Sequence, residues 1–331
     1  MVGTSLTGNG PTSNRVDSLL VDTSARIGST KVPAPVFTAS GCAASGQELD
    51  NYFDIAAIGG IVTKSIMIEP RSGRATPRMA ETPSGMLNGI GLQGPGIDQF
   101  LENDLAWLQQ RKVRTVVSIA GNTVEEYGRI ARKLRDLDWL TAVEVNISCP
   151  NVESRGQVFA CDPGASAAAV TEVRRALGVN IAVIAKLTPD VTDITSIARA
   201  VVDAGADGVA MINTLLGMVI DLDKLRPVLS GGTGGLSGPA IRPVAVRAIW
   251  QVHAALPNLP ILGMGGIRSG ADAMEFILAG ASAVSVGTSI FNDPGAPFRI
   301  QRELREELGN RGFSRLSDAV GYAHTVFEAT R

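Results

Sequence analysis

Eight short apolar runs, rich in β-branched residues, recur along the chain. Runs of this length are typical of strands whose two faces are both buried. Segments with apolar residues at every third or fourth position separate them and predict helices. The expected strands are Pro35–Ala39, Gly60–Lys64, Thr115–Ile119, Ala142–Ile147, Ala182–Lys186, Gly208–Ile212, Pro260–Gly263 and Ala283–Gly287. The expected helices are Thr123–Leu137, Pro163–Leu177, Ile194–Ala204, Ala240–Leu256, Ser269–Ala279 and Pro297–Leu308.

Strands that alternate with helices indicate a parallel sheet of the α/β class, and eight such units favour a closed (β/α)8 barrel, the TIM barrel. The alternative is an open doubly wound sheet. No dinucleotide-binding glycine fingerprint follows the first expected strand, which disfavours that alternative.

Composition limits the partners and the compartment of the protein. The 331 residues are 45% hydrophobic and carry a net charge of −2, so neither nucleic acid nor a membrane is an expected partner. The 3 cysteines show no CxxC spacing, which disfavours a disulfide framework or a metal site and favours the cytoplasm. Residues 1–15 predict a disordered tail, neither signal peptide nor anchor, and residues 16–331 predict one domain.

Two connections are unusually long for a compact domain. They are Ser65–Gly96 after the second expected strand and Thr214–Pro239 after the sixth. Both leave the carboxyl ends of strands, where barrel enzymes carry their active sites. We expect these long loops to cover or build a site.

The stretch Asn146–Asn151 places a thiol, Cys149, between two amide side chains where an apolar strand ends. A cysteine there can act as nucleophile or proton acceptor, and the amides can bind a planar ligand that contains amide groups. The alternative is a buried thiol that only packs. The two histidines of the chain lie within expected helices, which leaves Cys149 as the better candidate base.

Glycines follow the seventh and eighth expected strands, in Gly263–Gly270 and Val286–Thr288. At these two places barrels of this kind bind phosphate, because glycine lets backbone N–H groups approach phosphate oxygens. Lys64 and Lys186 end two other strands, and a lysine there is costly to desolvate unless it meets an anion. Either lysine could instead reach solvent. Together these features suggest an anionic cofactor such as a flavin.

Two further segments supply amide groups near the same strand ends, namely Asn88–Leu92 and Asn213-Thr214. Backbone N–H groups flanked by glycines can hold a carboxylate, and asparagine can read a urea-like edge. The alternative is that both asparagines are turn residues.

These motifs, together with Gly234–Pro239, resemble the dihydroorotate dehydrogenases, and among them the class 1 type with a cysteine base. The NAD-linked 1B branch is the most similar. The resemblance covers about Val32 to Pro294 and implies a single FMN-binding barrel that takes part in pyrimidine (UMP) biosynthesis. It implies an FMN site formed by Ala39, Ser40, Lys64, Ser65, Asn146, Lys186, Ile212, Gly238, Gly265, Gly266, Gly287 and Thr288. It implies a dihydroorotate site formed by Lys64, Asn88, Gly89, Ile90, Gly91, Leu92, Asn146, Asn151, Asn213 and Thr214.

The resemblance also implies a mechanism and partners. Cys149 would remove a proton from C5 of dihydroorotate while hydride leaves C6 for the flavin, and Lys186 would stabilise the reduced flavin. A homodimer is implied. Because this chain has no cysteine cluster of its own, either a separate subunit with FAD and an iron–sulfur cluster or a different soluble oxidant would accept the electrons. Val152–Cys161 would form a lid over the site.

Two positions depart from the family pattern. Ser118 stands where a flavin-contacting asparagine is usual, and Cys161 where glycine is more common. The alternative enzyme is a dihydropyrimidine dehydrogenase-like barrel acting on uracil or thymine, which Cys-Pro-Asn at 149–151 disfavours because that family tends toward Cys-Pro-His. A flavin-binding barrel without turnover is the other alternative.

Overall fold

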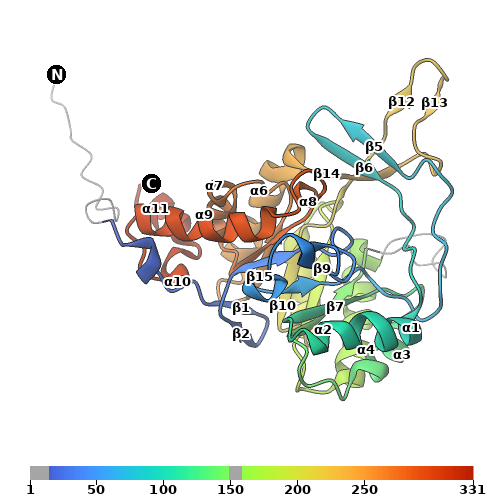
Figure 1. Cartoon of the computed structure of the whole chain (residues 1–331), viewed down its shortest axis with the longest axis horizontal. Coiled ribbons are helices and arrows are strands. Elements are labelled where there is room, and N and C mark those ends of the chain that lie inside the picture. Colours follow the sequence, from blue (N-terminus) through green and yellow to red (C-terminus); the bar gives the residue numbers. More distant parts are fainter. Residues whose placement is uncertain (1–14, 149–158, 331) are drawn as a thin grey trace.

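The structure, a computed structural model, describes residues 15–148 and 159–330. Its centre is a parallel sheet of eight strands whose neighbours follow chain order around a barrel. The predicted (β/α)8 barrel and its eight strands are therefore confirmed (Figure 1). The barrel strands are β3 (Val36–Thr38), β4 (Ile61–Val62), β7 (Thr115–Ile119), β8 (Ala142–Asn146), β9 (Val183–Leu187), β10 (Gly208–Met211), β15 (Ile261–Met264) and β16 (Ala283–Val286).

The seam between β3 and β4 closes the barrel. Gly59 N donates to Val36 O at 2.7 Å, and Thr38 N donates to Gly60 O at 3.3 Å. A Cβ atom at Gly59 would lie 2.6 Å from a backbone oxygen, so only glycine allows this approach. The Arg114 side chain then donates to the carbonyl oxygen of Gly59 at 2.8 Å and holds the turn before β4.

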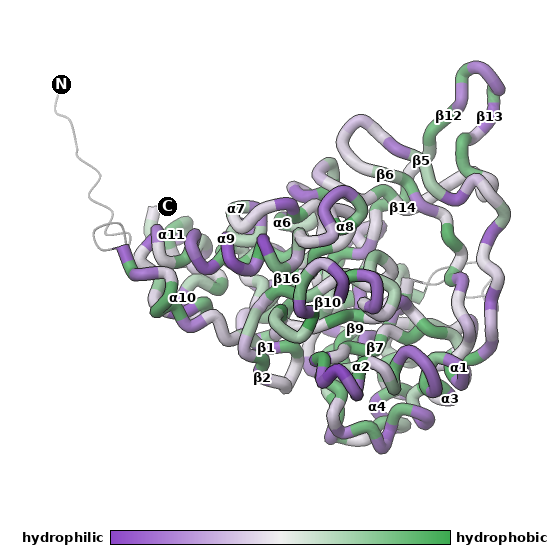
Figure 2. Tube along the Cα trace, in the orientation of Figure 1, coloured by the Kyte–Doolittle hydropathy of each residue, from purple (hydrophilic) through white to green (hydrophobic). Residues whose placement is uncertain are grey.

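The helices surround this barrel and bury their apolar faces against it. Figure 2 shows hydrophobic residues along the central strands and hydrophilic residues on outer helices such as α3 and α9. The helices are α1 (Ile97–Phe100), α2 (Ala106–Gln110), α3 (Val124–Leu134), α4 (Pro163–Leu177), α5 (Ile194–Asp203), α6 (Arg242–Ala255), α7 (Gly270–Ala279), α8 (Ser289–Asn292), α9 (Ala296–Asn310), α10 (Leu316–Ala319) and α11 (Tyr322–Ala329).

Local signals explain where the helices begin and end. Asp162 caps α4 by accepting from Ala165 N at 2.7 Å, and Pro163 occupies its first turn. Helix α6 begins at Arg242, later than the predicted Ala240, because Pro243 fits only the first turn of a helix.

The two long connections form strands and pair with each other. Their four-stranded antiparallel sheet has the order β11-β14-β6-β5, and β12 and β13 make a separate hairpin. Figure 1 shows β5, β6, β12 and β13 projecting on the side away from α10 and α11. The strands are β5 (Met79–Thr82), β6 (Gly85–Asn88), β11 (Leu215–Gly217), β12 (Ile220–Asp221), β13 (Arg226–Pro227) and β14 (Gly234–Ser237); near the amino terminus β1 (Ala25–Ile27) pairs with β2 (Thr30–Val32).

Candidate active site

Lys186 is the buried cation of the barrel interior. It lies on β9, and its side chain is 5% exposed. Its Nζ atom donates to Ser40 Oγ at 3.2 Å and lies 3.9 Å from Glu144 Oε1. Ser40 follows β3, so two predicted cofactor residues from distant parts of the chain meet here. A buried ammonium group in this position suits an anionic ring system.

Lys64, just after β4, is half-buried beside the thiol of Cys42. Burial lowers the pKa of Lys64, and its interaction with Cys42 opposes that change. Burial also raises the pKa of Cys42, while Lys186 and Lys64 lower it. The two predicted lysines therefore both interact with the Cys42 thiol, which indicates that they lie in the same part of the barrel.

The predicted residues Ser65, Asn146 and Asn213 form a connected polar group. Asn146 Nδ2 donates to Ser65 Oγ at 2.9 Å, and Asn213 Nδ2 donates to Asn146 Oδ1 at 3.4 Å. The backbone N–H of Ser148 donates to the same Oδ1 atom at 3.2 Å. The hydroxyl of Tyr127 donates to the carbonyl oxygen of Asn146 at 2.8 Å. Asn146 is therefore held by contacts to both its side chain and its main chain from several elements.

The glycine motifs converge near the ends of β15, β16 and β3. Gly265 and Gly266 have φ angles of 132° and 82°, and a Cβ at Gly266 would lie 2.7 Å from Gly238 O. A Cβ at Gly287 would lie 3.2 Å from the Cβ of Ala39. These approaches are too close for larger residues, and we call Gly265, Gly266 and Gly287 with the backbone around them the glycine cradle, the place where the sequence predicts a phosphate site.

Three more predicted cofactor residues are held around this cradle. Thr288 Oγ1 donates to Ser237 Oγ at 2.8 Å, next to Gly238. Ala39 N donates to Val286 O at 2.8 Å, and Ile212 N donates to Met264 O at 3.1 Å. Segments that are far apart in the sequence thus supply neighbouring parts of one site.

The four-stranded sheet places Asn88 and Thr214, two residues predicted to hold the substrate, on either side of Gly235. Asn88 pairs with Gly235, and Asn88 Nδ2 donates to Gly235 O at 3.3 Å. Gly235 also packs against the Thr214 side chain so closely that no Cβ would fit. The N–H of Gly89 donates to Arg78 O at 2.7 Å, so this N–H is not free to bind a ligand. Ile90, Gly91 and Leu92 follow in the same turn, where Gly91 and Leu92 have positive φ angles.

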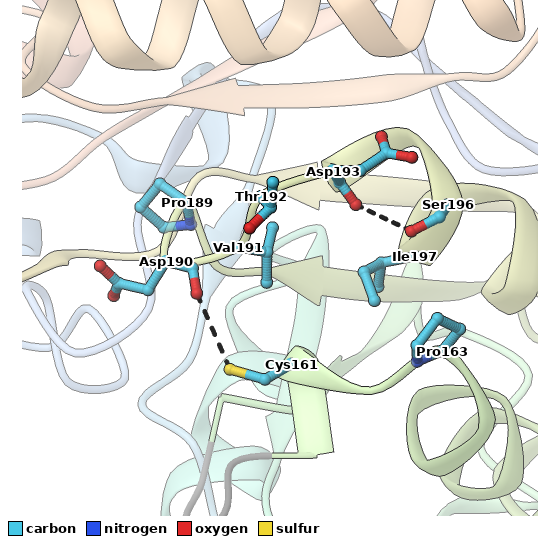
Figure 3. Close-up of a pocket in the computed structure, with 9 residues that line it drawn as sticks. All are labelled: Cys161, Pro163, Pro189, Asp190, Val191, Thr192, Asp193, Ser196 and Ile197. Carbon is cyan, nitrogen blue, oxygen red and sulfur yellow. Dashed lines mark hydrogen bonds between the residues drawn. The ribbon is translucent and has the colours of Figure 1, made fainter.

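Cys149 and Asn151, with most of the expected lid, lie outside the described residues. The end of that segment, Cys161, is described and lines an open pocket of about 690 Å³. Figure 3 shows the Cys161 thiol directed toward the Asp190 carbonyl oxygen, at 3.8 Å. None of the residues predicted to hold flavin or dihydroorotate lines this pocket.

Glu144 is a buried residue of the site that the sequence reasoning missed. It lies in the middle of β8 and is 0% exposed, and its Oε1 accepts from Ser118 Oγ at 2.8 Å. The signal was present, because a carboxylate inside an apolar strand needs a partner just as a lysine does. Ser118, noted only as a departure from the family pattern, connects Glu144 to Ser65.

The sequence model of the dihydroorotate dehydrogenase family matches residues 24–308, so the chain belongs to that family. Within it, curated relatives carry the name dihydroorotate dehydrogenase B (NAD(+)), catalytic subunit, which confirms the resemblance to the NAD-linked branch. The relative from Geobacter sp. (strain M21) is 48% identical over 300 residues, 91% of this chain and 97% of its own length. That from Desulforamulus reducens is 50% identical over 299 residues, 90% of this chain and 97% of its own length.

Dihydroorotate dehydrogenases depend on a flavin, and the glycine cradle and buried Lys186 fit such a group. In the described part of the chain, no cluster of three or more His, Cys, Asp or Glu side chains is placed to hold a metal ion. No helix among the described residues is long and apolar enough to cross a membrane.

Proposed function

We propose that this chain is the catalytic subunit of an NAD-linked dihydroorotate dehydrogenase, which oxidises (S)-dihydroorotate to orotate in the synthesis of UMP. The observation that carries the proposal is the meeting of Lys186, Ser40 and the Asn146–Asn213 pair at the carboxyl ends of the barrel strands. Family membership supports the same reaction.

We infer that the flavin is FMN. The glycine cradle would bind a terminal phosphate through N–H groups near Gly265, Gly266 and Gly287 and the hydroxyl of Thr288. When bound, FMN supplies the hydride-accepting centre of the reaction. The residues proposed to hold it are Ala39, Ser40, Lys64, Ser65, Asn146, Lys186, Ile212, Gly238, Gly265, Gly266, Gly287 and Thr288.

Dihydroorotate is a cyclic carboxylate with a urea-like edge. Asn146 and Asn213 present amide groups to that edge, and Lys64 offers a cation to the carboxylate. The turn after Asn88 would bind the same carboxylate through those backbone N–H groups that remain free. The full proposed set is Lys64, Asn88, Gly89, Ile90, Gly91, Leu92, Asn146, Asn151, Asn213 and Thr214.

Cys149 is the proposed base, which removes the proton from C5 of the substrate. In the sequence it directly follows Ser148, whose N–H donates to the Asn146 side chain. Lys186 is the second proposed catalytic residue, because its buried ammonium group would stabilise negative charge on a bound flavin.

The names of the relatives, which call them catalytic subunits, imply a separate partner subunit. We propose that this partner carries FAD and an iron–sulfur cluster and passes electrons to NAD. We further propose a homodimer of the catalytic chain, a cytoplasmic location, and one FMN-binding domain over residues 16–331. The tail predicted before it lies outside the described residues except for Arg15.

The test is orotate formation by the purified chain with a soluble artificial electron acceptor. We expect orotate from dihydroorotate and no comparable turnover of dihydrouracil, with FMN released on denaturation. Turnover of dihydrouracil without turnover of dihydroorotate would overturn the assignment in favour of a uracil-type enzyme.

A further inference from the structure

We propose that Glu144 is a positioning residue that fixes the orientation of the Asn146 carboxamide through a one-way chain of hydrogen bonds. The chain runs from the barrel interior to the carboxyl ends of the strands. Only its consequence for ligand binding depends on the proposed function.

The hydrogen-bond chain joins four side chains, which come from β7, β8 and the segment after β4. Glu144 Oε1 and Ser118 Oγ are 2.8 Å apart, and Ser118 Oγ and Ser65 Oγ are 2.9 Å apart. Ser65 Oγ is 2.9 Å from Asn146 Nδ2. Exposure is 0% for Glu144 and Ser118, 4% for Ser65 and 8% for Asn146, so water has little access to any of these bonds.

The number of available protons sets the direction of the chain. A carboxylate only accepts hydrogen bonds, and a serine hydroxyl has one proton to give. Ser118 gives its proton to Glu144 and must therefore accept one from Ser65. Since Ser65 donates its only hydroxyl proton to Ser118, it must accept from an N–H group of Asn146. The amide nitrogen consequently points inward and Oδ1 points toward the site.

The other end of the chain requires the same orientation. The backbone N–H of Ser148, which can only donate, lies 3.2 Å from Asn146 Oδ1. Asn213 Nδ2 donates to this oxygen as well, at 3.4 Å. The Glu144 carboxylate at one end and the Ser148 N–H at the other therefore favour the same orientation of the Asn146 carboxamide. In this orientation Asn146 Oδ1 is a hydrogen-bond acceptor beside Asn213.

Replacing the carboxylate by a carboxamide, as in Glu144→Gln, removes this constraint. The new side-chain amide would be able to donate to Ser118, which could then donate to Ser65, and Ser65 to Asn146 Oδ1. The amide nitrogen of Asn146 would then face two other donors, Ser148 N–H and Asn213 Nδ2. In the variant the inner end of the chain no longer imposes one direction, and Ser148 N–H and Asn213 alone hold the orientation of Asn146.

Glu144 Oε1 also lies 3.9 Å from Lys186 Nζ. The effect of breaking the hydrogen-bond chain must therefore be separated from the effect of removing this charge pair. Ser118→Ala interrupts the chain and leaves the pair of charges in place. Ser285→Ala is the matched control, since Ser285 is a serine on the barrel strand β16, 1% exposed, whose hydroxyl has no hydrogen-bond partner among the described residues.

The first experiment records the side-chain amide signals of the holoenzyme labelled with 15N-asparagine, with the Asn146 pair assigned by its loss in Asn146→Ala. We expect Glu144→Gln and Ser118→Ala to move the Asn146 signals, whereas Ser285→Ala leaves them in place. Unchanged Asn146 signals in both variants would overturn the proposal. Ser118→Ala alone decides the outcome should Glu144→Gln not fold.

The second experiment measures orotate affinity from the change that orotate causes in the flavin spectrum. We expect each variant to weaken binding about tenfold, the usual cost of a polar contact made with the wrong partner. The double variant should lose no more than either single one, because both break the same chain. Additive losses would contradict the proposal. If the wild-type protein does not bind orotate, the proposed function fails, while the amide signals still test the role of Glu144.

Discussion

The ammonium group of Lys186 lies 3.9 Å from Oε1 of Glu144, and both side chains are almost completely buried in the barrel. Each charge offsets part of the cost of burying the other. Glu144 Oε2, however, has no hydrogen-bond partner among the described residues. The carboxylate therefore relies on Lys186 and Ser118 for its stabilisation.

Removing Lys186 should consequently destabilise the fold. We expect Lys186→Met to lower the free energy of unfolding of the flavin-free protein by about 3 kcal/mol, because Glu144 is left as an unpaired buried charge. Denaturant titration measures this change. Lys31→Met is the matched control, since Lys31 is an exposed lysine on β2. Adding Glu144→Leu to Lys186→Met should restore part of the stability, and a further loss would contradict the pairing.

The glycine cradle yields a second prediction. At Gly266, alanine would suffer both from the positive φ angle and from the approach of its Cβ to Gly238 O at 2.7 Å. Gly178→Ala is the control, because Gly178 has a φ angle of 76° and open space around it. The control should lose about 1 kcal/mol and keep its flavin. Gly266→Ala should lose more stability and should not retain FMN on gel filtration; normal retention would refute the cradle.

The sequence predicted the barrel well because parallel strands buried on both faces must be apolar along their whole length. The same reasoning missed the sheet of the long connections. β14 contains Gly234 and Gly235, which have low strand propensity, and it forms because it pairs with β6 and β11 on either side.

In the candidate site, too, the sequence predicts some features and not others. Strand-end lysines and glycines are visible in the sequence, since their chemistry conflicts with an apolar neighbourhood. The chain from Glu144 to Asn146 joins residues from β7, β8 and the segment after β4, and their contacts depend on how the barrel brings these strands together. The spacing of these residues along the sequence does not predict such contacts.

Stability should fall in mild acid because of His253 on α6. Burial, with a further contribution from His324, lowers the pKa of His253 from its ordinary value of 6.5. Below pH 6.5 the unfolded chain binds a proton at His253 more readily than the folded protein does. The free energy of unfolding therefore decreases as the pH falls below 6.5. Thermal unfolding at pH 7.5 and about 5.5 should show a smaller decrease for His253→Gln than for the wild type. An equal decrease in both would exclude His253 as the cause.

Replacement of the proposed base should slow the reduction of the flavin. A serine hydroxyl accepts a proton far less readily than a thiolate, so Cys149→Ser should reduce the rate near neutral pH by roughly 100-fold or more. Stopped-flow absorbance measures this rate, and Cys161→Ser, which replaces the described cysteine of the pocket, is the matched control. A fast Cys149→Ser enzyme would reject Cys149 as the base.

The most direct measurement is to mix the purified protein with L-dihydroorotate in the absence of oxygen and to follow the visible flavin absorbance. The proposed function predicts that the absorbance bleaches and that one orotate forms for each flavin reduced. A protein that binds FMN but stays oxidised with excess dihydroorotate would contradict the proposed function.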